Sequence, residues 1–323
     1  MTIHKRYTGS DRATVDVLTG DWVVAAAHLR DVMHDQRFTP GYLTWLYDQN
    51  PVGDTVAVDI CDDDDEIIAH GAALPQRLRK GDREALFVLI VNAAVQPRAQ
   101  GNNIFATKII EHIPYVLEQG CIGGYGVTNE RSTVPSLRLD GLGAHLVSQL
   151  PLKICPPLGT GAGVASYDVD EQFLSSELFE EVAGQLDEHP AENWTQRWTP
   201  ELLRWRLSRP DVRYAMHIGD RAVAITTKST AWGTPVAVIT KLLPRRPWLG
   251  TVSGRELVAA ACRHHRAPSA FYAGFNACVR VRGVSVPRKY MPSPLNLMFL
   301  TLSDLDPASF GFDIFEFLDF DAL

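Results

Sequence analysis

The residues whose types and spacing best suit ligand binding lie where a long apolar run meets an amphipathic segment. Residues 85–95 are almost all aliphatic or aromatic, which is typical of a buried central strand, and Pro97 cannot continue a strand ladder. A short polar turn with one glycine, Gly101, follows, and residues 104–113 have the pattern of an amphipathic helix. A helix N-terminus placed after a strand and a tight turn presents backbone N–H groups and the positive end of the helix dipole, and a glycine lets phosphates approach closely. The sequence therefore predicts a pyrophosphate-binding turn over residues 95–104.

Two common phosphate-binding patterns are absent from the sequence. It contains neither the GxxxxGK[ST] pattern of a P-loop nor the GxGxxG pattern of a dinucleotide-binding fold. The turn instead resembles motif A of the Gcn5-related N-acetyltransferase (GNAT) superfamily, whose pattern is [RQ]xxGx[GA]. Arg98 and Gly101 match this pattern, and Asn103 stands where the last small residue is expected.

A second segment also resembles this superfamily. Asn129 and Ser132 open a polar helical stretch, and the tripeptide Leu-Gly-Ala follows at residues 142–144. This order is similar to motif B, an Asn-x-x-Ser/Ala helix that closes on Leu-Gly-aromatic, with alanine in place of the aromatic residue. Residues 36–150 therefore resemble one whole acetyltransferase fold.

The resemblance implies an N-acyltransferase whose donor is acyl-coenzyme A, or an acyl group on a phosphopantetheine arm. In such enzymes two strands splay apart where they meet the pantetheine, and the exposed strand edge hydrogen-bonds the amides of the cofactor. The resemblance assigns donor binding to residues of the turn and of the start of the motif B helix, namely Ala94, Val95, Arg98, Gln100, Gly101, Asn102, Asn103, Ile104, Asn129 and Ser132.

Acyl transfer from a thioester to an amine needs a neutral amine, a stabilised oxyanion and a proton donor for the leaving thiolate. The superfamily often uses a glutamate on the central strand as base and a tyrosine on the motif B helix as acid, and neither is evident here. The candidate catalytic residues are Asn92 and Tyr125. Asn92 is expected either to orient a water or bind the acceptor, or to have a structural role at a strand bulge. Tyr125, which lies between two glycines, is expected either to approach the pantetheine or to pack in the core. His70 is more typical of a strand histidine satisfied in place.

An offset of 160 residues aligns the chain with itself. Residues 37–45 (RFTPGYLTW) then fall on residues 197–205 (RWTPELLRW), with five of nine positions identical. Each segment indicates a helix start, with threonine as N-cap, proline at the first helical position and an apolar face that includes Trp45 or Trp205. A hairpin pattern and a third strand follow in each half. Because the offset is close to half of the 323 residues, the sequence predicts duplication of one α/β module.

The expected fold class is α/β, with two tandem GNAT-like modules that each hold a mixed, mostly antiparallel sheet flanked by helices. A segment rich in proline and glycine, 151–167, predicts a boundary between an N-terminal domain with the acyl-donor site, 1–155, and a C-terminal domain, 156–323. The second module is expected to be degenerate, because Pro244 and Pro247 remove backbone donors where a phosphate turn would stand.

Composition and charge argue against several classes of protein, among them general nucleic-acid binders and membrane proteins. Hydrophobic residues at 46% and charged residues at 21% are ordinary globular values, and a net charge of −7 argues against broad nucleic-acid binding. No secretory signal or membrane-length apolar stretch occurs, so a cytoplasmic protein without membrane contact is expected. Five cysteines without a CxxC pair indicate no metal site, and the acidic run 62–65 is expected to be a hairpin turn because it lacks calcium-loop spacing.

The sequence leaves the acceptor and the carrier of the acyl group open. An amine of a small molecule is the expected acceptor. The alternatives are an aminoacyl-tRNA donor on the same fold, an acyl carrier protein as partner, and a non-catalytic acyl-coenzyme A sensor or scaffold. Basic residues within 280–291 indicate either ordinary surface salt bridges or a surface for an anionic acceptor, a carrier protein or a nucleic-acid end.

Overall fold

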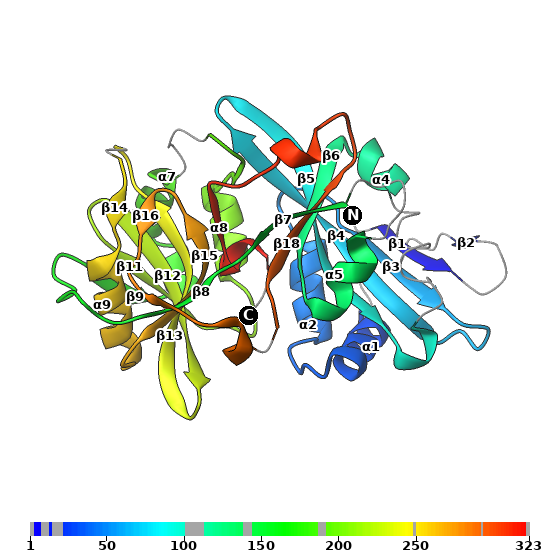
Figure 1. Ribbon diagram of the computed structural model, residues 1–323, viewed down its shortest axis with the longest axis horizontal. Coiled ribbons are helices and arrows are strands. Elements are labelled where there is room, and N and C mark those ends of the chain that lie inside the picture. Colours follow the sequence, from blue (N-terminus) through cyan, green and yellow to red (C-terminus); the bar gives the residue numbers. More distant parts are fainter. Residues whose placement is uncertain are drawn as a thin grey trace.

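The computed structural model describes residues 3–7, 13–14, 22–100, 113–137, 144–186, 192–247, 250–291 and 293–320. The chain forms two lobes that lie side by side, and each lobe contains one large sheet (Figure 1). None of the helices in these ranges combines the length and the hydropathy needed to cross a bilayer.

The first sheet is mostly antiparallel. Its strand order is β2 (Ala13–Thr14), β1 (Ile3–Tyr7), β3 (Val56–Cys61), β4 (Ile67–Lys80), β5 (Arg83–Val95), β6 (Cys121–Thr128), β18 (Asn296–Thr301) and β7 (Ala144–Gln149), with β10 (Thr195–Gln196) paired to β4. Only β1 with β3 and β5 with β6 pair in parallel among the described strands of this sheet.

The second sheet has the same mixed character. Its order is β17 (Val284–Ser285), β8 (Leu152–Cys155), β15 (Ala270–Asn276), β13 (Thr234–Pro244), β12 (Ala222–Ala231), β11 (Tyr214–Ile218) and β9 (Ala165–Asp168), with β19 (Ile314–Glu316) paired to β15. The pair β13 and β15 is parallel. Two short strands, β14 (Val252–Ser253) and β16 (Val279–Arg280), pair separately.

Helices flank both sheets. Those of the first lobe are α1 (Val23–Met33), α2 (Pro40–Leu43), the π-helical η1 (Thr44–Asp48), the 3₁₀ turn η2 (Pro97–Ala99), α4 (Ile113–Glu118) and α5 (Glu130–Leu137). Those of the second half are α6 (Glu171–Leu174), α7 (Glu177–Gly184), α8 (Pro200–Leu207), α9 (Arg255–His265), η4 (Arg288–Tyr290), η5 (Pro307–Ser309) and η6 (Phe317–Asp319).

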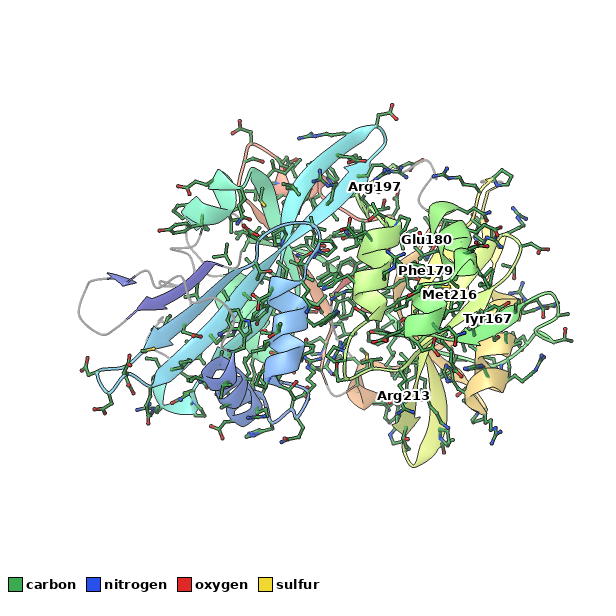
Figure 2. All side chains as sticks on the ribbon, turned by 180° about the vertical axis from the view of Figure 1, so that it is seen from behind. Tyr167, Phe179, Glu180, Arg197, Arg213 and Met216 are labelled. Atoms are coloured by element: carbon green, nitrogen blue, oxygen red, sulfur yellow. The ribbon has the colours of Figure 1, made fainter. Side chains whose placement is uncertain are left out.

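Alternating side chains explain how the second sheet is covered on both faces. Val223 and Ile225 of β12 pack in the core that includes Phe179 of α7, which Figure 2 shows in the lobe interior. Ala222 and Ala224 point to the other face, where they pack with α9. A strand with period-2 side chains that is apolar on both faces must be covered twice, which places the sheet between two helical layers.

The two helices of the sequence repeat begin alike. Thr39 Oγ1 accepts a hydrogen bond from the backbone N–H of Tyr42 at 3.1 Å, and Thr199 Oγ1 accepts one from Leu202 at 3.1 Å. A proline occupies the first helical position in both cases. The helix starts predicted from the repeat are confirmed.

The repeated tryptophans meet at the contact between the lobes. Trp45 Nε1 donates to the carbonyl oxygen of Trp205 at 2.8 Å, and Trp205 Nε1 donates to that of Trp45 at 2.9 Å. The two rings stack with centroids 5.2 Å apart. The reciprocal bonds mean that equivalent positions face each other across a local two-fold relation, as in an isologous contact.

The two sheets exchange strands. Leu152–Cys155, in β8, directly follows the first lobe but lies between β15 and β17 of the second sheet. Asn296–Thr301, in β18, comes from the second half but lies between β6 and β7 of the first sheet (Figure 1). Neither sheet is therefore built from one continuous stretch of chain.

The strand orders of the two sheets correspond. The order β3-β4-β5-β6-β18-β7 in the first sheet corresponds, strand by strand, to the order β11-β12-β13-β15-β8-β17 in the second. This correspondence supports the duplication, which stays a prediction. The division at residues 155 and 156 also stays a prediction. A cut there would separate β8 from the second sheet and β18 from the first sheet.

A histidine cluster lies at the outer edge of the second sheet. His217 of β11 is fully buried, with Nδ1 2.8 Å from Ser166 Oγ and Nε2 2.8 Å from Thr226 Oγ1. The same threonine oxygen lies 2.7 Å from Nε2 of His265 in α9. One hydroxyl thus bridges two imidazoles.

Burial keeps these imidazoles neutral. Burial, and then the charges of His264 and His265, lower the pKa of His217 to about 3. Burial, followed by the charges of His264 and Lys228, lowers the pKa of His265 to about 4, against a smaller opposite effect of Asp168. Both side chains titrate near pH 6.5 when unfolded.

We expect the folded state to lose stability on acidification. Between about pH 6.5 and pH 4 the unfolded chain binds protons at positions 217 and 265 that the folded chain does not, so the stability is full above this window and falls as the pH decreases through it. The expected loss between pH 7.5 and pH 5 is about 2 kcal/mol for one such group. Urea unfolding at the two pH values measures it, and a His217→Gln variant should show a smaller difference. Equal differences in both proteins would contradict this assignment.

Candidate functional site

Two neighbouring strands of the first sheet separate part-way along their length. Pairing between β5 and β6 is recorded at Leu86 with Cys121, Val88 with Gly124 and Leu89 with Tyr125. Both strands continue beyond this last pair. The separation is where the sequence resemblance places the arm of the acyl donor.

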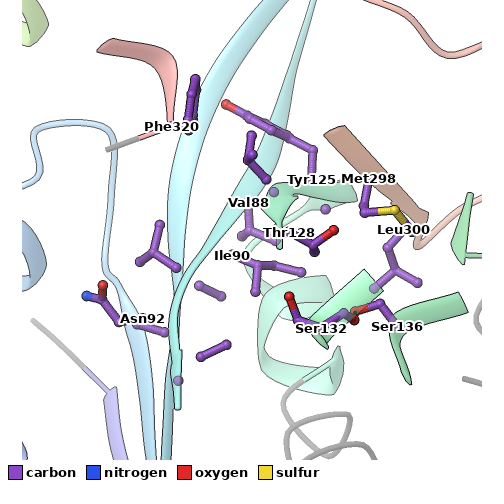
Figure 3. Close-up of a pocket in the computed structure, with 18 of the residues that line it drawn as sticks. Val88, Ile90, Asn92, Tyr125, Thr128, Ser132, Ser136, Met298, Leu300 and Phe320 are labelled. Carbon is purple, nitrogen blue, oxygen red and sulfur yellow. Dashed lines mark hydrogen bonds between the residues drawn. The ribbon is translucent and has the colours of Figure 1, made fainter. Parts of the chain in front are cut away.

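A cavity of about 410 Å³ lies at the separation. Its wall is formed by β4, β5, β6, β18, the helices α4 and α5, and Phe320 (Figure 3). Most of the lining is apolar, and among the described lining residues only Arg37 and Tyr125 have titratable side chains. The cavity therefore suits a long, uncharged chain with hydrogen-bonding amides.

Asn92 lies at a bulge in β5 where it lines the cavity. His70 pairs with Ala94 and Ala72 with Val91, so one residue of β4 faces two of β5. Asn92 has φ +54°, a left-handed conformation that asparagine tolerates better than most residues. Its Nδ2 donates to the hydroxyl of Tyr47 at 2.7 Å. The bulge considered from the sequence is present, and a part in catalysis stays a prediction.

Tyr125 both packs in the core and lines the cavity. Its ring makes edge contacts with Phe312 and Phe315, with centroids 5.2 and 5.9 Å apart. Burial, and next the charge of Asp319, raises the pKa of Tyr125, while Arg206 acts in the opposite direction. The phenol stays protonated at neutral pH and keeps its proton available as a donor.

The turn after β5 is described as far as Gln100. Ala94 and Val95 end the strand, and Gln100 Nε2 donates to the carbonyl oxygen of Val95 at 3.1 Å. Gly101, Asn102, Asn103 and Ile104, which the sequence assigns to donor binding, lie outside the described residues.

Arg98 is held by the acidic hairpin turn. One of its terminal nitrogens lies 2.6 Å from Asp62 Oδ2 and 2.9 Å from Glu66 Oε2. The backbone N–H of Asp62 donates to the carbonyl oxygen of Glu66 at 2.9 Å, which confirms the turn predicted for the acidic run. Arg98 is 54% exposed, so these ion pairs are weak and an anion could compete for it.

Asn129 and Ser132 are brought together at the start of α5. Asn129 Oδ1 accepts hydrogen bonds from the backbone N–H groups of Arg131 and Ser132, both at 3.0 Å, as an N-cap does. Asn129 and Ser132 also line the cavity. In the structure Asn129 caps helix α5. The contact of Asn129 and Ser132 with an acyl donor stays a prediction.

Two residues that the sequence analysis missed, Asp59 and Tyr47, stand behind Asn92 and bond to His70, which is satisfied in place as expected. His70 is fully buried, with Nδ1 2.6 Å from Asp59 Oδ1 and Nε2 3.0 Å from the hydroxyl of Tyr47. The signal that could have found Asp59 is the acidic turn, because a hairpin that closes there pairs Asp59 with His70. No group of three or more potential metal ligands that could hold an ion is present within the described ranges.

Comparisons with known proteins identify the fold. No protein-family model and no curated protein matches the chain. A GCN5-related N-acetyltransferase from Anabaena variabilis ATCC 29413 superposes with a TM-score of 0.56 at 11% identity, over 86% of this chain and 69% of that one. A conserved protein of unknown function, a probable N-acyltransferase from Enterococcus faecalis V583, gives 0.54 at 11% identity, over 86% and 69%. Eis1 from Mycobacterium abscessus gives 0.51 at 9% identity, over 88% and 73%. The chain therefore has the fold of the GCN5-related N-acetyltransferases, as the two sequence motifs predict.

Proposed function

We propose that this protein is an N-acyltransferase that moves an acyl group from acyl-coenzyme A, or from a phosphopantetheine carrier, to an amine of a small molecule. The observation that carries the proposal is the separation of β5 and β6 over a largely apolar cavity of about 410 Å³. An extended arm with two amides fits between two strand edges, because backbone N–H and C=O groups that lack a strand partner can bond to it.

Two glycines of β6 lie where this strand passes close to β5 at the start of the separation. A Cβ atom at Gly124 would lie 3.2 Å from Val88 Cγ2, and one at Gly126 would lie 2.9 Å from the carbonyl oxygen of Ile90. Larger residues would push the two strands apart and change the shape of the slot. Arg98 and the predicted turn at residues 95–104 would then hold the phosphates at the end of β5.

The chemistry requires a new bond between the amine nitrogen and the acyl carbon, cleavage of the carbon–sulfur bond, and transfer of one proton from nitrogen to sulfur. We assign Tyr125 as the hydrogen-bond donor toward the departing sulfur, because its phenol remains protonated. We assign Asn92 to the acceptor amine. No carboxylate or imidazole is among the described lining residues. We propose that positioning of the two substrates contributes to the rate enhancement.

Thiol release tests the proposal. Purified protein with acetyl-coenzyme A and a panel of primary amines should release free thiol over many turnovers. The Gly101→Glu variant, which puts a carboxylate in the predicted phosphate turn, is the negative control. Coenzyme A binding without turnover for every amine would favour a non-catalytic acyl-coenzyme A sensor, the candidate supported by the lack of a described acidic or imidazole group in the cavity. Salt-sensitive tRNA binding without coenzyme A binding would favour an aminoacyl-tRNA donor.

A side chain at Gly126 is expected to weaken donor binding. In Gly126→Val the new atoms fall within contact distance of the Ile90 carbonyl oxygen and enter the slot, so coenzyme A should bind about ten- to a hundredfold more weakly. Isothermal titration calorimetry measures this. The matched control is Gly184→Ala at the end of α7, where an added Cβ meets open space. Unchanged affinity in a folded Gly126→Val protein would remove the slot from the proposal.

In the second sheet, the position that corresponds to the donor slot is occupied by another strand of the chain. Pairing between β13 and β15 is recorded only as far as Ile239 with Tyr272. Beyond it β19 pairs with β15 at Gly274 and its neighbours, and a Cβ at Gly274 would lie 2.0 Å from the carbonyl oxygen of Phe315. The strand takes the place that an acyl-donor arm would need, which supports the degenerate second module.

The groups that could attract phosphate in the second module are also engaged. Arg245 donates to the side-chain oxygen of Gln185 and to the carbonyl oxygen of Gly219. The backbone N–H groups of Thr160 and Gly161 already donate to the Glu256 carboxylate in the first turn of α9, at 2.9 and 2.7 Å, and this carboxylate would repel a phosphate. We therefore expect one coenzyme A per chain. Calorimetric titration to two equivalent sites would contradict the single site.

A further inference from the structure

A buried line of hydrogen bonds leads from the core of the first lobe to the cavity. It runs from Asp59 on β3 through His70 on β4 and Tyr47 on η1 to Asn92 on β5, with successive distances of 2.6, 3.0 and 2.7 Å. The first three side chains are at most 3% exposed, and Asn92 alone lines the cavity. Four elements of the fold thus converge on one amide at the bulge.

The line has a definite direction. Asn92 Nδ2 donates to the Tyr47 oxygen, and His70 Nε2 lies where it can accept the hydroxyl proton. In this arrangement the His70 ring carries its proton on Nδ1 and donates it to the Asp59 carboxylate. The oxygen of the Asn92 amide makes no hydrogen bond to a described residue, and Asn92 is one of the residues that line the cavity.

Protonation of His70 would reverse the direction. An Nε2–H would donate to the Tyr47 oxygen, and if the tyrosine proton then went to Asn92, the amide would turn its oxygen toward Tyr47. Burial lowers the pKa of the nearby His28 of α1, and a charge on His70 would lower it further, against a smaller opposite effect of Asp59.

The second module lacks the line. At the offset of 160, Leu207 stands where the first module has Tyr47, and it is a buried residue of a regular α-helix, α8. In the first module the helix widens into the π-helical η1 at this point, and such local widening is frequent at functional sites. The second module therefore has no counterpart of Tyr47 at this position, and its own buried hydrogen bonds run through His217 and Thr226.

We propose that Asp59, His70 and Tyr47 are positioning residues that hold the Asn92 amide with its oxygen toward the cavity, where it accepts a hydrogen bond from the acceptor amine. This inference rests on the proposed N-acyltransferase function. It makes Asn92 a residue that distinguishes the acceptor, and it leaves donor binding to the β5–β6 slot and the turn after β5.

Steady-state kinetics with acetyl-coenzyme A and an amine found active in the thiol-release panel test the inference. Tyr47→Phe removes one hydroxyl, and we expect the KM for the amine to rise about tenfold with the KM for acetyl-coenzyme A unchanged. Asn92→Ala should show the same split. The double variant should be no worse than Asn92→Ala alone, because Tyr47 acts through Asn92. Thr226→Val, which removes a hydroxyl bonded to two histidines in the second module, is the matched control and should leave both KM values unchanged.

Additive losses in the double variant, or an unchanged amine KM in Tyr47→Phe, would overturn the inference. A readout that needs no turnover separates it from the proposed function. Nitrogen-15 NMR of histidine-labelled protein should show one buried neutral histidine with its proton on Nδ1 that shifts in Asp59→Asn and Tyr47→Phe. If no amine supports thiol release, the proposed function fails. The tautomer of His70 would still show in which direction the hydrogen bonds from Asp59 to Asn92 run. A charged His70, or a proton on Nε2 at neutral pH, would overturn it in either case.

Discussion

A chain cut after residue 155 is expected to lose coenzyme A binding entirely, although every residue of the predicted donor turn lies before the cut. The cut removes β18, which pairs with β6 on one side and β7 on the other. Met298, Phe299 and Leu300 of this strand also form part of the cavity wall. Without β18 the first sheet has an unpaired internal edge, and edges of this kind promote aggregation.

Expression of residues 1–155 and 156–323 singly and together tests this expectation. Each fragment alone should be poorly soluble and should give no heat with coenzyme A in calorimetry. Co-expression should recover at least part of the binding, since each fragment then supplies the strand that the other lacks. A soluble N-terminal fragment that binds coenzyme A with the affinity of the whole chain would show that β18 is dispensable.

Lys241→Met is expected to destabilise the protein by about 3 to 5 kcal/mol. Lys241 Nζ is buried and lies 2.5 Å from Asp319 Oδ2 and 3.2 Å from Glu316 Oε2. Burial raises the pKa of Glu316, and the charge of Lys241 opposes that rise. Without the lysine, two buried carboxylates would face each other with no cation between them.

Urea unfolding measures the change in the free energy of unfolding. The matched control is Lys289→Met on the exposed turn η4, where we expect a change within about 0.5 kcal/mol. The effect of Lys241→Met should also reach the cavity, because Asp319 directly precedes Phe320, a residue of the cavity wall. Equal stability of the two variants would show that the buried carboxylates are protonated and do not need the lysine.

Local signals made much of the first lobe predictable. Proline at position 97 ends β5 as expected, and the acidic run forms the turn between β3 and β4. The helix start at Thr39 and its repeat at Thr199 use the capping bonds that their residue types favour. Each of these features depends on neighbours within a few residues, which is the range over which sequence patterns carry information.

The strand exchange and the line behind Asn92 depend on distant partners. The Thr128 hydroxyl meets the carbonyl oxygen of Asn296 across 168 residues, and nothing in the pattern of either segment specifies that pairing. Tyr47 joins the line from the π-helical η1, whereas a tyrosine in an apolar helix face indicates core packing from sequence alone. The fold class was predictable from the sequence, whereas the assembly of the cavity from both halves was not.

The exchange of β18 also sets the order in which this protein can mature on the ribosome. Residues up to Thr128 are made long before Asn296 emerges, and at typical rates of synthesis the 168 intervening residues take on the order of 10 to 30 s. During that interval β6 and β7 have no strand between them, and the nascent first lobe exposes backbone that only β18 covers. We therefore expect the newborn polypeptide to depend on holding chaperones until β18 has emerged.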